Sequence, residues 1–117
     1  MLDRAFTSKI VVVTAATSGI GKEAARLFAD AGAEVVVLNG RSVETGTAVR
    51  DELALAFPKT RFLFIPADLN VPEQSGEMFD RIQREIGRVD VLVHCGGAQV
   101  KPDFFVRLDP ATDREQI

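Results

Sequence analysis

The chain has 117 residues, enough for one domain with a buried hydrophobic core. Hydrophobic residues make up 46% of it, charged residues 26%, and the net charge is −3, which argues against disorder and against a basic surface for nucleic acid or anionic membrane. The single cysteine, Cys95, excludes an internal disulfide and favours a reducing compartment. No apolar segment approaches the ~20 residues of a membrane span, and the N-terminus lacks the pattern of a signal peptide, so we expect a cytoplasmic protein.

The first predicted element is a strand at residues 9–14 (KIVVVT), a continuous β-branched run typical of a strand buried on both faces. A helix is expected from near Gly19 to near Gly32, with an apolar face of Ile20, Ala24, Leu27, Phe28 and Ala31. The turn between them is built of small residues, two of them with hydroxyl donors: Ala15, Ala16, Thr17, Ser18, Gly19 and Gly21. Because the first N–H groups of a helix are unpaired and carry partial positive charge, this turn is either a cradle for a phosphate or a corner that serves packing only.

The remaining elements continue the alternation of strands and helices. Strands are predicted at residues 34–38 (EVVVL), 61–65 (RFLFI) and 89–94 (VDVLVH). The segments between them have apolar residues at helical spacing, from Val43 to Phe57 and from Met78 to Ile86. This alternation predicts parallel strands joined by right-handed crossovers, and therefore an α/β fold.

The spacing of small residues after the first strand resembles the glycine motif of the short-chain dehydrogenase/reductase family: Thr14 and Ala15 are followed by Gly19, Ile20 and Gly21. The resemblance covers the whole chain. It implies a three-layer α/β/α Rossmann-like parallel sheet in which this turn binds the phosphates of a nicotinamide dinucleotide. Ala15 stands where glycine is usual in the family, and so requires a negative φ or accepts some strain.

Two later segments also resemble this family. Asp68 and Leu69, just after the third predicted strand, resemble the family's contact to the adenine ring, and the alternative is a turn aspartate that caps the next helix. Residues 90–98 (DVLVHCGGA) resemble the family's DVLVNNAGA segment, which passes close to the cofactor. The departures from that segment are His94, Cys95 and Gly96.

The end of the second predicted strand bears on the choice of nicotinamide cofactor. An acidic residue at that place binds the ribose 2′-OH and favours NAD, but residues 38–41 read LNGR and include no acid. Arg41 offers a fixed charge suited to a 2′-phosphate, and family members with Gly-Arg at this place tend to use NADP. We therefore expect NADP rather than NAD, and the alternative for Arg41 is a surface residue that caps a turn.

The resemblance implies catalysis by a Ser, a Tyr-x-x-x-Lys pair and an earlier Asn, with the Tyr as general acid/base. The chain contains no tyrosine, so we expect residues 1–117 to lack turnover of the alcohol or carbonyl substrates on which such an oxidoreductase acts. His94 and Cys95 do not replace these residues, because neighbours on a strand point to opposite faces. One His and one Cys also cannot complete a usual metal-ligand set, so no catalytic or metal-binding residue is predicted.

The family's strand order is 3-2-1-4-5-6-7, and the predicted strands of this chain account for 3-2-1-4. We therefore expect one partial NAD(P)-binding domain, truncated after the fourth strand, with residues 95–117 irregular or exchanged between chains. The fourth strand would be an unpaired apolar edge. This predicts a homodimer through that edge or through the exchanged C-terminal segment.

Two other interpretations stay open. One is a self-associating, non-catalytic protein that has kept the fold and binds nucleotide weakly or not at all. The other is a small flavodoxin-like or receiver module, which needs one more strand. A receiver also has acidic clusters at its strand ends, where this chain has Thr14, Asn39 and His94.

Overall fold

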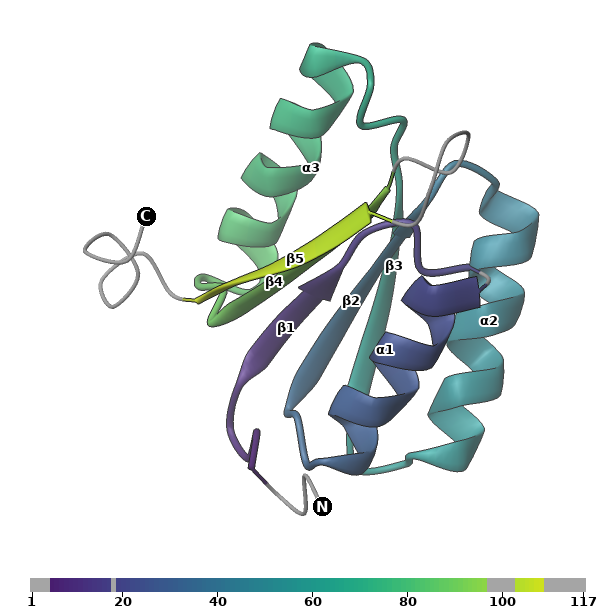
Figure 1. The fold of residues 1–117 in the computed structure, drawn as a ribbon, viewed down its shortest axis with the longest axis vertical. Coiled ribbons are helices and arrows are strands. Elements are labelled where there is room, and N and C mark those ends of the chain that lie inside the picture. Colours follow the sequence, from purple (N-terminus) through teal and green to yellow (C-terminus); the bar gives the residue numbers. More distant parts are fainter. Residues whose placement is uncertain (1–4, 18, 97–102, 109–117) are drawn as a thin grey trace.

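The computed structural model describes residues 5–17, 19–96 and 103–108. Within these residues the chain forms five strands and three helices, in this order: β1 (Ile10–Val13), α1 (Gly19–Asp30), β2 (Val35–Gly40), α2 (Val43–Ala56), β3 (Arg61–Pro66), α3 (Pro72–Glu85), β4 (Val91–Gly96) and β5 (Asp103–Leu108). The sheet has the order β3-β2-β1-β4-β5, with the first four strands parallel and β5 antiparallel to β4. The predicted Rossmann-like α/β fold with strand order 3-2-1-4 is therefore confirmed (Figure 1).

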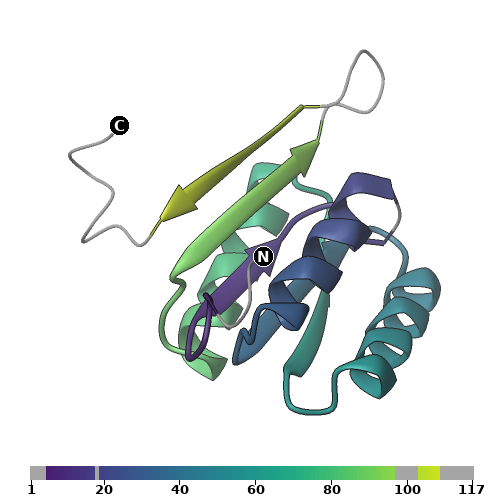
Figure 2. The same ribbon diagram turned by 60° about the horizontal axis from the view of Figure 1, so that its bottom comes forward.

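Helices cover both faces of the sheet, with α1 and α2 on one face and α3 on the other (Figures 1 and 2). Side chains of β1 alternate between the two resulting cores, because successive side chains of a strand point to opposite faces. Val11 and Val13 belong to the core under α1 and α2, whereas Ile10 and Val12 belong to the core under α3. Within the described residues, none of the helices is long and apolar enough to cross a membrane.

Helix α1 buries its small residues most completely, while Phe28 packs half-buried against the same core. Its buried residues are Gly21, Ala25 and Ala29, whereas Ile20 is 49% exposed and Leu27 is 40% exposed. The apolar face predicted from periodicity is therefore wrong at these two positions. Side chains no larger than a methyl group let the helix backbone approach β1 and β4 closely, and this close approach selects the buried face by size rather than by hydrophobicity.

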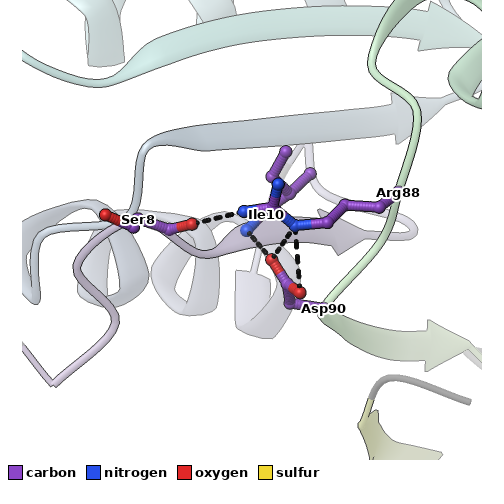
Figure 3. Close-up of polar contacts among 4 residues, drawn as sticks. All are labelled: Ser8, Ile10, Arg88 and Asp90. Carbon is purple, nitrogen blue, oxygen red and sulfur yellow. Dashed lines mark hydrogen bonds and ion pairs between the residues drawn. The ribbon is translucent and has the colours of Figure 1, made fainter. Parts of the chain in front are cut away.

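A polar cluster ties the amino ends of β1 and β4 together (Figure 3). The Ile10 N–H donates to Asp90 Oδ2 at 2.8 Å, and Asp90 N–H donates to the Ile10 carbonyl at 2.9 Å. Arg88 Nε donates to both carboxylate oxygens of Asp90, at 3.2 and 3.1 Å, and Arg88 Nη2 donates to the Ser8 carbonyl at 2.7 Å. Because Asp90 is only 12% exposed, its carboxylate depends on these donors for the hydrogen bonds that water would otherwise supply.

We expect Asp90→Ala to lower the free energy of unfolding by about 1–3 kcal/mol, because it leaves the buried Ile10 N–H without an acceptor. The matched control is Glu85→Ala, which removes a carboxylate from an exposed Arg81–Glu85 pair at 2.7 Å on α3. That control should cost less than about 0.5 kcal/mol. Urea denaturation measures both changes, and equal losses in the two variants would contradict the role assigned to Asp90.

The structure corrects the expected edge at the fourth strand. β5 pairs with β4 over its full length, from Val91 opposite Leu108 to Gly96 opposite Asp103, so β4 is not an unpaired edge. The expectation that residues 95–117 are irregular is wrong for 95–96 and 103–108, while 97–102 and 109–117 lie outside the described residues. Unpaired backbone N–H and C=O groups along a strand cost free energy. Here β5, from the same chain, pairs with those groups of β4. Homodimer formation through the edge of β4 is therefore not supported.

Candidate functional site

The turn between β1 and α1 contains an alanine in a left-handed conformation. Ala15 has a φ of 51°, and Gly19, where α1 begins as predicted, has a φ of 59°. Of the two options that the sequence left for Ala15, the structure shows the strained one. A left-handed conformation costs an L-residue about 1–2 kcal/mol, so surrounding contacts must hold Ala15 in place.

Asn39, at the end of β2, supplies two of those contacts. Its Oδ1 accepts a hydrogen bond from the Ala15 N–H at 3.3 Å, and its main-chain carbonyl accepts one from the Ala16 N–H at 2.7 Å. Both N–H groups are therefore directed toward β2. Ala15 was predicted to contact the cofactor, and its N–H is already engaged within the protein.

The first turn of α1 lies directly on this turn. A Cβ on Gly21 would lie 2.1 Å from the Ala15 carbonyl oxygen, so only glycine permits this approach. A Cβ on Gly19, in contrast, would meet no described atom within 4 Å, and the first turn of α1 contains no acidic residue. Space therefore lies beside Gly19 at the amino end of α1, and no acidic side chain in the first turn offsets the positive end of the helix dipole, two features that suit an anion.

The end of β2 lies against the turn through Gly40. A Cβ at Gly40 would lie 2.7 Å from Cγ2 of Thr17, so the Thr17 side chain fills the place that an acidic residue at position 40 would need. The next residue, Arg41, is exposed. Ser42 Oγ accepts a hydrogen bond from the Thr45 N–H at 3.1 Å and caps α2. Arg41 therefore does not cap this helix, which leaves its guanidinium as an exposed cation between β2 and α2.

Asp68 stabilises the loop between β3 and α3. Its Oδ1 accepts from the Asn70 N–H at 3.0 Å, and its own N–H donates to Gln74 Oε1 at 2.8 Å. The cap of α3 is Val71, without a side-chain hydrogen bond, so the alternative of Asp68 as the helix cap is wrong. Leu69 is half-buried and packs against the core under α3.

At the ends of β1 and β4, Thr14 connects the two strands. Its hydroxyl oxygen accepts a hydrogen bond from the Cys95 N–H at 2.9 Å and lies 3.1 Å from Nδ1 of His94. The side chain of Cys95 lies in the core under α1 and α2, where burial raises the pKa of its thiol. The raised pKa favours the protonated thiol, which is a poor nucleophile.

The predicted site residues thus lie on one side of the domain, at the carboxyl ends of the four parallel strands (Figure 1). Ser18 lies outside the described residues, and Gly96 is placed only as the last residue of β4. Sequence reasoning did not assign roles to Thr14 and Asn39, although a polar residue ending an apolar buried run was a usable signal. A cavity of about 410 Å³ lies at the amino ends of the strands, near Ser8, Glu34 and Lys59, away from these residues.

The family model for short chain dehydrogenases matches residues 9–115. The chain belongs to the short-chain dehydrogenase family. It is 32% identical over 95 residues to meso-2,3-butanediol dehydrogenase of Serratia marcescens, in an alignment that covers 81% of this chain and 36% of the relative. It is 36% identical over 118 residues to cis-4-hydroxycyclohexanecarboxylate dehydrogenase of Sinomonas cyclohexanicum, covering 99% of this chain and 45% of the relative.

Solved structures of short-chain dehydrogenases share the fold. L-sorbose reductase from Gluconobacter frateurii, solved in complex with NADPH and L-sorbose, superposes with a TM-score of 0.75 at 30% identity. The match covers 81% of this chain and 36% of that reductase. The chain therefore spans less than half the length of these family members.

We expect Gly21→Ala to lower the free energy of unfolding by about 1–3 kcal/mol, because the new methyl group would push α1 away from Ala15. Gly76→Ala is the matched control. Gly76 lies within α3, and a Cβ there would meet no described atom within 4 Å, so this change should stabilise the chain by about 0.5–1 kcal/mol. Chemical denaturation measures both, and a Gly21→Ala chain as stable as the wild type would rule out the close contact.

Proposed function

We propose that residues 1–117 form the NADP(H)-binding portion of a short-chain oxidoreductase that acts on an alcohol or carbonyl group. The observation that carries this proposal is the space beside Gly19 at the amino end of α1. Because Gly21 has no side chain, this end of the helix can lie against the left-handed turn at Ala15. The topology supports it as well. Strand order reverses between β1 and β4, and ligands of open α/β sheets bind outside the carboxyl ends of the strands at such a reversal.

We propose that the described residues would contact a dinucleotide in three places. The N–H groups at the start of α1, with the Thr17 hydroxyl, would hold the phosphates. Asp68 and Leu69 would lie at the adenine, and His94 with the end of β4 near the nicotinamide half. Hydride transfer is the chemistry that NADP(H) supplies when bound, and the role of this chain is to bind and orient the cofactor.

The preference for NADP over NAD is proposed from the end of β2. Gly40 has no acidic side chain for a ribose 2′-OH, and Thr17 occupies the space where one would lie. Arg41 is exposed beside it and offers a guanidinium suited to a 2′-phosphate. The NADPH present in the L-sorbose reductase structure is consistent with this choice.

We propose that this portion binds cofactor without turnover. The family's general acid/base is a tyrosine, and the sequence has none, so no copy of this chain can supply the proton. We also propose a cytoplasmic location and self-association. Self-association would use β5, which among the described strands pairs only with β4 and so has one unpaired side.

Calorimetric titration with NADPH and NADH tests the cofactor assignment. We expect NADPH to bind more tightly than NADH, and Arg41→Ala to weaken NADPH about 10–100-fold while leaving NADH unchanged, because a charge-assisted contact to the 2′-phosphate is lost. Arg81→Ala is the charge-matched control on the opposite face of the sheet, where Arg81 pairs with Glu85. It should change neither affinity.

Two results would count against the proposal. Equal affinities for the two dinucleotides, unaffected by Arg41→Ala, would remove the assigned NADP preference. No heat with either dinucleotide would favour the alternative of a fold that has lost nucleotide binding.

A further inference from the structure

Asn39 is a buried polar residue whose carboxamide nitrogen and oxygen are both hydrogen-bonded within the protein. It is 2% exposed, and its Nδ2 donates to the carbonyls of Ile65 at 3.3 Å and Ala67 at 3.2 Å, while Oδ1 accepts from Ala15. Two carbonyl acceptors and one N–H donor fix which end of the carboxamide faces which neighbour. Asn39 therefore cannot turn outward to reach a ribose without leaving buried polar groups unpaired.

These bonds oppose the intrinsic preference of Ala15. A φ of 51° is unfavourable for alanine, yet Asn39 takes the N–H groups of Ala15 and Ala16 in succession, the second through its main-chain carbonyl at 2.7 Å. One residue thus sets the direction of two consecutive peptide units. The N–H groups of Ala15 and Ala16 are thus engaged within the protein, whereas those that begin α1 are the ones proposed to bind an anion.

The same side chain connects the turn to the loop after β3. Ala67 accepts from Asn39 Nδ2 and donates its N–H to the Gly40 carbonyl at 2.9 Å. Asp68 follows immediately in the chain. The phosphate side and the adenine side of the proposed site therefore share Asn39 as an anchor.

We infer that Asn39 is a positioning residue for dinucleotide binding, which holds the Ala15 turn and the Ala67 loop in one arrangement without contacting the cofactor. The effect on affinity rests on the proposed function, whereas the effect on the turn does not. Because Asn39 acts on the phosphate turn rather than on the ribose 2′ position, its removal weakens NADPH and NADH by the same factor. This separates it from Arg41, which changes their ratio.

The test compares Asn39→Ala with Thr60→Val in the chain of residues 1–117. Thr60 is a matched control, because it is 8% exposed and its hydroxyl donates to the Ala33 carbonyl at 2.8 Å, at the amino end of β3. Calorimetry should show both dinucleotide affinities lowered about tenfold in Asn39→Ala, with their ratio unchanged. Thr60→Val, which also loses a buried hydrogen bond, should change them by less than about twofold.

Two further measurements separate positioning from general destabilisation. Glycine adopts a positive φ without steric cost, so Ala15→Gly in the Asn39→Ala background should recover several-fold of the lost affinity. Amide hydrogen exchange without ligand, followed by NMR, should rise about tenfold or more at the Ala15 N–H in Asn39→Ala. The Thr14 N–H, bonded to the Val93 carbonyl at 2.9 Å, should keep its exchange rate.

Unchanged exchange of the Ala15 N–H in Asn39→Ala overturns the inference, whether or not the chain binds nucleotide. Equal losses of affinity in Asn39→Ala and Thr60→Val, or a changed ratio of NADPH to NADH in Asn39→Ala, also overturn it. If the wild-type chain binds neither dinucleotide, the proposed function fails, and the exchange of the Ala15 N–H still decides whether Asn39 holds the turn.

Discussion

The contact between the Ala15 carbonyl and the first turn of α1 is the constraint on which the rest of the site depends. With no Cβ at Gly21, the helix begins directly above the turn, and a Cβ on Gly19 would meet no described atom within 4 Å. Ala15 in this turn is left-handed, with φ at 51°, and its N–H donates to Asn39 Oδ1. The close approach of α1, the strained φ of Ala15 and the buried acceptor Asn39 therefore occur together in one turn.

The polar residues of the sheet lie at the two ends of its parallel strands. At the amino ends, Asp90 binds the Ile10 N–H and Arg88, and these contacts hold β1 beside β4. At the carboxyl ends, Thr14 bonds to the end of β4 through a buried hydrogen bond, and Asn39 bonds to the turn after β1 through a partly buried one. Between these ends, β1 to β4 contribute apolar side chains to the cores on both faces of the sheet. The contacts at the amino ends of the strands therefore stabilise the sheet, and those at the carboxyl ends shape the surface on which a ligand would bind.

Much of this arrangement follows from sequence pattern, and the exceptions have physical reasons. Short runs rich in apolar residues located the four parallel strands, and the small-residue turn located the start of α1. The exposure of Ile20 and Leu27 was missed because the close approach of α1 to the sheet favours small buried residues such as Ala25 and Ala29. β5 was missed because its pairing depends on an edge that only the folded sheet presents. The bonds of Asn39 join residues 24 to 28 positions apart, so no local pattern indicates them.

The most direct test of the account is to map NADPH binding on the backbone amides of the chain by NMR. The account predicts that the largest chemical-shift changes fall at Gly19, Ile20 and Gly21, with smaller ones near Asp68 and at the end of β4. The N–H groups of Ala15 and Ala16, already bonded to Asn39, should shift less than those of α1. Shifts that gather instead around the cavity near Ser8 and Lys59, or no shifts at saturating NADPH, would contradict the claim that the open end of α1 holds the cofactor's phosphates.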